Sequence, residues 1–189
     1  MTMIKKKIIA CKVFTDELSA VLPKEYRDID ITWLDAGLHF NLDKLEFTLK
    51  QALKDAATEG ADARFLFGSG CHPDMCHITN SHGGKILGAK NCIEALCQES
   101  YNELGQDRTM VITPGWVRFF PDMMAAAGWD EVDIRQNFGR YDRFLLMDTG
   151  INPLSEEEIP EFYDLTQVPV EIQQISLDHF RAKLIEVLR

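Results

Sequence analysis

Short, unbroken apolar runs recur along the 189-residue chain, and longer amphipathic stretches separate them. Runs such as 8–10 and 144–147 show no alternation between apolar and polar residues. Strands with this pattern are buried on both faces, which is typical of parallel sheets covered by helices. The expected strands, in chain order, are residues 8–10, 30–34, 64–67, 85–87, 109–112, 144–147 and 168–175.

Helical periodicity occupies the segments between these runs. Leucines spaced three or four residues apart mark one face of a helix that begins at Leu42 and ends near Gly60. Asn91, with Glu94 three residues later, forms a capping-box pattern that predicts the start of another helix. Further helices are expected at residues 14–22, 121–127, 131–138, 156–165 and 177–188. The sequence therefore predicts a single α/β domain, residues 1–189, with a mostly parallel sheet and helices on both faces, as in three-layer Rossmann-like or flavodoxin-like folds.

The chain is acidic, with 30 Asp and Glu residues against 20 Lys and Arg residues and a formal net charge of -10. A surface that binds nucleic acid or anionic lipid needs clustered basic residues, and the longest basic run is only Lys5 to Lys7. No apolar window reaches the length of a membrane span, and no signal-peptide cleavage pattern follows the basic run. We therefore expect a cytoplasmic protein with no nucleic-acid partner and no membrane partner.

Three of the five cysteines follow predicted strands. Cys11 comes directly after residues 8–10, and Cys92 comes shortly after residues 85–87. Cys71 follows residues 64–67 after a turn that contains Gly68 and Gly70. Sites in open parallel sheets form at the carboxyl ends of the strands, where loops from neighbouring strands meet. We therefore expect these three cysteines at one edge of the sheet, whereas a disulfide framework is not expected in a cytoplasmic chain.

Each expected location favours a thiolate. Cys92 lies in the first turn of the helix capped by Asn91, where free N–H groups lower the pKa of a thiol. The turn that contains Gly68 and Gly70 is able to point several backbone N–H groups at one anion beside Cys71. Three thiolates at one point repel each other unless a cation lies between them. A metal ion or an iron–sulfur cluster satisfies this requirement, and three protein ligands leave one position open.

Other residues are candidates for a smaller part in the site. A fourth ligand is expected to be His72 or Cys76, with His77 as a further candidate, whereas Cys97 is expected to face the core. Asp148 ends the run 144–147 at the same edge, either as a general acid or base or as a turn former.

Aromatic residues and a further histidine also follow predicted strands. Trp116, Phe119 and Phe120 are expected either in the core or as an apolar wall of the site. His82 lies in a turn from which it is able to reach towards the cysteines.

One alternative to the metal hypothesis is a structural role in the core, and a second kind of site, for a nucleotide, is not expected. Free cysteine is among the most buried residue types, so each cysteine taken alone is better explained as a core residue, whereas for the three together the metal and core explanations are about even. A nucleotide site is not expected, because the chain has no G-x-G-x-x-G pattern and its glycine-rich turn lacks the Lys-Ser/Thr ending of a phosphate loop.

The segments I-I-A-C, G-S-G-C-H-P-D, G-A-K-N-C-I-E and N-F-G-R-Y-D-R-F-L-L-M-D-T-G resemble the domain of unknown function 1638 family. The resemblance covers nearly the whole chain. That family occurs in methanogenic archaea and anaerobic bacteria, often encoded close to corrinoid-dependent methyltransferases. The resemblance implies that Cys11, Cys71 and Cys92 are the family's three cysteines, and that Cys76 and Cys97 match none of its motif positions. It also implies a link to anaerobic one-carbon, corrinoid or sulfur metabolism, without specifying a reaction.

Four hypotheses follow. In the first, which we favour, Cys11, Cys71 and Cys92 hold a [4Fe-4S] cluster whose open iron faces a small-molecule ligand. In the second, the same residues hold zinc, which activates a thiol or a methyl acceptor. In the third, the chain is a non-catalytic partner or metal-delivery module for a corrinoid protein or methyltransferase. In the fourth, Cys71 is a metal-free nucleophile with a histidine as its base.

Overall fold

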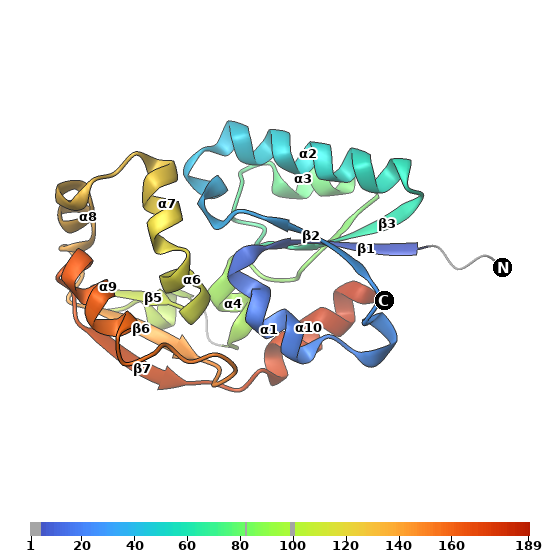
Figure 1. Ribbon diagram of the computed structural model, residues 1–189. Helices are drawn as coiled ribbons and strands as arrows, with labels where there is room; N and C mark the ends of the chain where they lie inside the picture. The colour runs from blue at the N-terminus through green and yellow to red at the C-terminus, as the bar shows by residue number, and fades with distance from the viewer. Residues whose placement is uncertain (1–4, 82, 99–100) are drawn as a thin grey trace.

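The computed structural model describes residues 5–81, 83–98 and 101–189. Within these ranges the strands form two sheets, and both sheets are entirely parallel (Figure 1). The first sheet has the order β2-β1-β3-β4, and the second has the order β5-β6-β7. The strands of the first sheet are β1 (Lys5–Cys11), β2 (Asp30–Leu34), β3 (Ala61–Leu66) and β4 (Lys85–Ile86). The strands of the second sheet are β5 (Thr109–Ile112), β6 (Arg143–Asp148) and β7 (Val170–Gln174).

Helices connect the strands. Those between β1 and β5 are η1 (Lys12–Phe14), α1 (Thr15–Val21), η2 (Lys24–Tyr26), η3 (Ala36–Phe40), α2 (Leu42–Thr58), α3 (Met75–Asn80), α4 (Cys92–Leu96) and α5 (Tyr101–Leu104), where η denotes a 3₁₀ helix. Those after β5 are α6 (Pro114–Arg118), α7 (Phe120–Ala127), α8 (Glu131–Phe138), α9 (Glu158–Thr166) and α10 (Asp178–Leu188). The last of these, α10, returns to the first sheet and packs beside α1 (Figure 1).

Helices cover both faces of the first sheet, with α2 and α3 on one side and α1 and α10 on the other (Figure 1). Successive side chains of a strand point to opposite faces, so the unbroken apolar run of β1 supplies both layers of the core. Ile9 packs with Leu49 of α2, whereas Ile8 and Ala10 pack in the cluster that contains Phe180 of α10. The continuous apolar pattern of β1 therefore reflects burial on two sides.

The second sheet is covered in the same way. Phe144 and Leu146 of β6 pack in a cluster with aromatic side chains from α6, α7, α8 and α9. Leu145 and Met147 face the opposite side, where they pack with Ile93 of α4. Cys97 follows α4 as its C-cap residue and is buried in this second layer, in agreement with the expectation of a core residue.

The two sheets meet through two close contacts at the carboxyl ends of their strands. Gly115 of α6 lies so near η1 that a Cβ there would stand 2.5 Å from the carbonyl oxygen of Val13. Gly37 of η3 lies so near α7 that a Cβ there would stand 2.9 Å from the Cβ of Ala126. Because η1 follows β1 and η3 follows β2, both contacts involve segments that leave the carboxyl ends of strands in the first sheet.

The long helix α2 follows directly from its sequence. Asn41 caps it, because the Asn41 Oδ1 accepts a hydrogen bond from the backbone N–H of Lys44 at 3.0 Å. Its apolar positions form one stripe that is buried against the first sheet. The helix ends just before Gly60, which has a φ of +67°, a conformation that glycine adopts without strain.

The α/β class predicted from the sequence, with parallel strands and flanking helices, is confirmed. The strands are divided between two sheets, a separation that the apolar pattern does not specify. The short helices α3, α5 and α6 are also absent from the expectation. In the part of the chain that the structure describes, no helix combines the length and the apolar character needed to cross a membrane.

Candidate metal centre

A cavity of about 500 Å³ lies at the carboxyl ends of β1 and β3 and at the start of α4. Cys11, Cys71 and Cys92 all line it. The remaining lining comes from η1, η3, the start of α2, the turn after β3 and α6. The cavity is therefore shared by segments from both sheets, and the three cysteines come from three separate parts of the sequence.

Each cysteine is placed by the strand or helix next to it. Cys11 is the last residue of β1, and it pairs with Leu34 of the neighbouring strand β2. Cys71 follows β3 in a tight turn, in which its backbone N–H donates to the carbonyl of Gly68 at 3.1 Å. Cys92 is the first residue of α4, immediately after the N-cap residue Asn91.

Asn91 caps α4 as the sequence predicts, with one difference in the second half of the capping box. Its Oδ1 accepts the N–H of Glu94 at 2.9 Å. The Glu94 carboxylate accepts the backbone N–H of Lys90 at 3.1 Å, which lies one residue before the cap. This arrangement fixes the 90–92 segment, and with it the position of Cys92.

Gly68 brings the loops of Cys71 and Cys92 together. A Cβ on Gly68 would lie 2.2 Å from the carbonyl oxygen of Lys90 and 2.5 Å from the Cα of Asn91, so only glycine allows this approach. Gly70 is less tightly placed, with 3.0 Å between its ideal Cβ position and the same carbonyl oxygen. Both glycines line the cavity, and their main effect is to let two backbones touch.

The prediction that this turn points several N–H groups at one anion is wrong. The N–H of Ser69 donates to the carbonyl of Ala89 at 2.9 Å, and the N–H of Gly70 donates to the carbonyl of Lys90 at 2.8 Å. These donors are used to join the two loops, so they are not available to a ligand. Only the backbone N–H of Gly68 acts on the Cys71 thiol, where its hydrogen bond lowers the pKa slightly against the effect of burial.

Burial raises the pKa of all three thiols. Desolvation raises the pKa of Cys11 to about 12, with smaller upward effects from the charges of Cys71 and Asp35. The pKa of Cys92 is raised by burial and then by the charges of Cys11 and Cys71. The pKa of Cys71 is raised by burial as well. Because the charge on one sulfur changes the pKa of another, the three thiols lie within electrostatic reach of each other.

The expectation of a depressed pKa for Cys92 is not met. The backbone N–H groups of Cys92 and Ile93 do lower this pKa, as predicted, but desolvation of the thiol raises it more. The physical reason is that α4 has only five residues, so the partial charges at its start do not replace the hydration that the thiol loses.

The chemistry of this donor set fits a thiophilic metal. Thiolate is the form that binds a metal, and a bound metal displaces the thiol protons that burial otherwise retains. Among the described residues, no three His, Cys, Asp or Glu side chains are arranged to hold a single metal ion. Zinc and iron–sulfur clusters both bind cysteine thiolates, so the donor types are compatible with either group.

The candidate fourth ligands lie elsewhere. His72 is 5 % exposed, its Nδ1 accepts the backbone N–H of Asp74 at 3.0 Å, and its Nε2 lies 4.0 Å from the Oε2 of Glu46. Cys76 and His77 are exposed on α3. The cavity lining includes none of the candidates His72, Cys76 and His77. The prediction for His82 concerns a residue outside the described ranges.

Asp148 also lies away from the cavity lining. It is buried at the end of β6, where its Oδ1 accepts the N–H of Gly150 at 2.8 Å. Its Oδ2 accepts the side-chain N–H of Gln174 at 2.7 Å, which ties β6 to the end of β7. Of the two roles predicted for Asp148, these contacts match the turn former.

Two cavity residues extend the site beyond the cysteines. Trp116 of α6 lines the cavity, as the apolar-wall expectation allows, while Phe120 packs in the core of the second sheet. His39 lines the cavity from η3, and sequence reasoning missed it. The signal was present, because η3 follows the predicted strand 30–34 at the same sheet edge as the cysteines.

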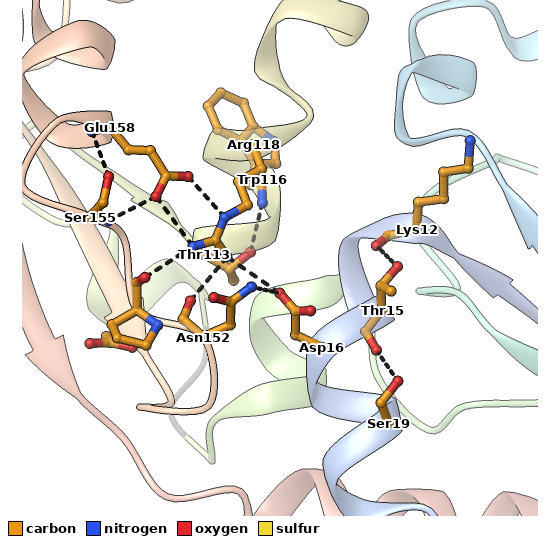
Figure 2. A network of polar contacts seen from close by, with 12 residues as sticks. Lys12, Thr15, Asp16, Ser19, Thr113, Trp116, Arg118, Asn152, Ser155 and Glu158 are labelled. Atoms are coloured by element: carbon orange, nitrogen blue, oxygen red, sulfur yellow. Dashed lines mark hydrogen bonds and ion pairs between the residues drawn. The ribbon is translucent and has the colours of Figure 1, made fainter.

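Arg118 of α6 lies at the centre of the polar network in Figure 2. Its Nε donates to Glu158 at 2.9 Å, and its Nη1 lies 3.3 Å from the Oδ2 of Asp16. Its guanidinium also donates to the carbonyls of Asn152 and Pro153, each at 3.0 Å. The network therefore ties α1, which follows η1, to α6 and to the segment before α9.

Comparison with known proteins gives one match. Residues 33–184 match the family described as "Protein of unknown function (DUF1638)". Cys71 and Cys92 lie inside the matched range, and Cys11 precedes it. No curated protein and no solved structure matches the chain. Because the family match spans well over half of the sequence, the chain belongs to the DUF1638 family.

Proposed function

We propose that this chain is a metal-binding protein in which Cys11, Cys71 and Cys92 hold a [4Fe-4S] cluster with one iron open to a small-molecule ligand. The observation that carries the proposal is the convergence of these three thiols on one cavity. When bound, such a cluster supplies a Lewis-acidic or redox-active iron at its open corner. The chain's own residues contribute the thiolates and the walls that exclude water around them.

The electrostatics of the cavity support a cation at this place. Desolvation raises the pKa of all three thiols, Cys71 raises the pKa of Cys11, and both raise that of Cys92, so the three are unfavourable as thiolates without a counter-charge. The same raised pKa argues against the metal-free alternative, since Cys71 as a nucleophile needs a depressed pKa or an adjacent base. The choice of a cluster over zinc follows from the anaerobic context that the family resemblance implies.

We further propose a cytoplasmic protein of anaerobic one-carbon, corrinoid or sulfur metabolism, with a corrinoid protein or methyltransferase as partner. The free state of all five cysteines agrees with a reducing compartment. Family membership supports the metabolic link through the resemblance described above. Affinity purification of the tagged protein from an anaerobic host, followed by identification of a co-purifying corrinoid protein, tests the partnership directly.

Metal analysis on anaerobically purified protein tests the central proposal. We expect iron and acid-labile sulfide in equal amounts, together with a brown chromophore. Cys71→Ala is expected to lose most of both, because two thiolates do not retain the cluster. Cys76→Ala is the matched control, since Cys76 is exposed on α3 and lies outside the cavity lining, and it should keep the wild-type content.

The same measurement separates the alternatives. Stoichiometric zinc without sulfide, lost in Cys71→Ala and kept in Cys76→Ala, would replace the cluster by the zinc site. Protein that binds neither iron nor zinc after anaerobic reconstitution would remove the metal proposal altogether.

A further inference from the structure

We infer that the cavity beside the three cysteines binds a small, uncharged organic molecule with an apolar body. This inference names the ligand class of the proposed site. The inference shares its cavity with the proposed metal site. The ligand class itself follows from the residues that line the cavity and does not require the metal.

The cavity has the size of an organic ligand site. Its volume of about 500 Å³ falls within the range of roughly 300–1,000 Å³ that is typical of such pockets. Most of its wall is apolar, with Phe14 and Phe67 from the first sheet's loops and Trp116 from α6. These rings come from three separate segments, so an apolar ligand would be contacted from several sides.

Charged groups are absent from the described part of this wall. The polar residues among the described lining are the three cysteines, His39 and Asn91, and none of these is an Asp, Glu, Lys or Arg. A carboxylate or phosphate ligand would therefore lose its hydration without gaining a basic partner, and an ammonium ligand would find no carboxylate. An uncharged molecule avoids both costs.

Two neutral polar groups are available to orient the ligand. His39 lines the cavity, and partial desolvation lowers its pKa, which favours the neutral imidazole. The Oδ1 of Asn91 is occupied by the N–H of Glu94, which leaves the amide N–H groups of Asn91 as donors. A site with apolar walls and a few neutral polar groups is typical of pockets for uncharged organic ligands.

A matched set of three probes tests the ligand class. Methyl phenyl sulfide is uncharged, 4-(methylthio)benzoate adds a negative charge, and 4-(methylthio)benzylammonium adds a positive charge on the same framework. Titration calorimetry is run anaerobically on the purified protein and on chelator-treated protein. We expect the uncharged sulfide to bind about a hundredfold more tightly than either charged probe.

Leu42→Lys gives the second arm of the test. Leu42 lines the cavity from the first residue of α2 and is 42 % exposed, so a lysine there places a charge at the cavity without filling the core. Val132→Lys is the control, because Val132 is 60 % exposed in the first turn of α8 and lies outside the lining. We expect Leu42→Lys to weaken the binding of methyl phenyl sulfide and to strengthen the binding of 4-(methylthio)benzoate, each by about tenfold. Val132→Lys should change neither affinity.

The outcomes are distinguishable from those of the metal proposal. Binding of methyl phenyl sulfide that persists in chelator-treated or metal-free protein supports the ligand class, whatever the metal analysis gives. Equal or tighter binding of the benzoate or the ammonium probe would overturn the inference, as would failure of all three to bind. Identical effects of Leu42→Lys and Val132→Lys would overturn it as well, because binding would then lie outside this cavity.

Discussion

Glu17 has a buried carboxyl group in an unfavourable electrostatic setting. It is 2 % exposed, and its Oε2 has no hydrogen-bond partner among the described residues. Burial raises its pKa to about 7, with Asp16 and Asp148 raising it further and Arg118 lowering it. The side chain of Glu17, which belongs to α1, is therefore partly protonated at neutral pH.

Replacement of this carboxyl by an amide should change how stability depends on pH. The folded protein binds the Glu17 proton more tightly than the unfolded chain, whose carboxyl has the ordinary pKa of 4.5. Its contribution to stability is therefore complete below that value and declines as the pH rises towards 7. Relative to Glu17→Gln, the wild type should lose about 3 kcal/mol of unfolding free energy over this interval.

Denaturant unfolding of both proteins from about pH 4 to about pH 8 measures this difference, since the contributions of all other groups cancel in the comparison. Parallel stability curves for the two proteins would show that the Glu17 pKa is not raised. A wild type that gains stability relative to the variant as the pH rises would show that the sign is wrong.

Residue types and their neighbours predicted the identity of the cavity cysteines but not their ionisation. The positions of Cys11, Cys71 and Cys92 follow from strand ends, which apolar runs mark clearly. The pKa of a thiol depends on how many atoms surround it, and that number is fixed by packing between distant segments. A short helix start near Cys92 was therefore outweighed by a burial that the local sequence does not encode.

At the scale of elements, the turn after β3 determines how closely two loops approach. Gly68→Ala would place a Cβ 2.2 Å from the carbonyl oxygen of Lys90, so backbone on one side has to move. We expect a loss of about 2–3 kcal/mol of unfolding free energy, together with less metal bound per chain, because residues 90–92 carry Cys92.

Gly88→Ala is the matched control for this prediction. A Cβ at Gly88 meets only the flexible end of Lys183, at 3.4 Å, so stability should change by less than about 0.5 kcal/mol. Chemical denaturation and metal analysis of the two variants are the measurements. Equal stability of the two variants would show that the turn tolerates a side chain and that its closeness is not required.

The α-helices that could not be predicted from the sequence are all short. The helices α3, α5 and α6 have six, four and five residues, too few for a 3.6-residue periodicity to repeat. For α6 a different signal was present, because Thr113 accepts the N–H of Trp116 at 3.1 Å and Pro114 occupies the first turn. The long helix α2, by contrast, has both a cap and a repeated apolar stripe, and it was predicted closely.

At the scale of the whole molecule, Arg118 connects the parts that contain the two sheets. Arg118→Ala removes the ion-pair partner of Asp16 and Glu158, which keep their hydrogen bonds from Asn152 and Ser155, and leaves two backbone carbonyls without the arginine donor. Because these charges are only partly buried, we expect a loss of about 1–2 kcal/mol of unfolding free energy. Hydrogen exchange in α1 should become faster, since its tie to α6 is lost.

Arg135→Ala provides the comparison, because exposed Arg135 pairs with Glu131 of its own helix α8 and donates to the carbonyl of Asp164 in α9, and neither partner belongs to α1. It should change stability by less than about 0.5 kcal/mol and leave exchange in α1 unaltered. Equal losses in the two variants would mean that Arg118 acts as an ordinary surface charge rather than as a connection between α1 and α6.

The division of the strands between two sheets could not be predicted from the sequence, for a physical reason. An apolar run indicates that a strand is buried, but not which strand lies beside it. The contribution of His39 and Trp116 to one cavity depends on how η3 and α6 pack across that division. Sequence reasoning therefore predicted the cysteines of the site better than the walls around them.

The packing of α10 has a consequence for the order of assembly during synthesis. Phe180 stacks on Phe14 with ring centroids 5.2 Å apart, and Phe14 forms part of the cavity wall next to Cys11. A nascent chain that has not yet reached residue 180 lacks this support, even though all three cysteines have already left the ribosome. The cavity wall beside Cys11 is therefore complete only after α10 has been synthesised and has packed against Phe14.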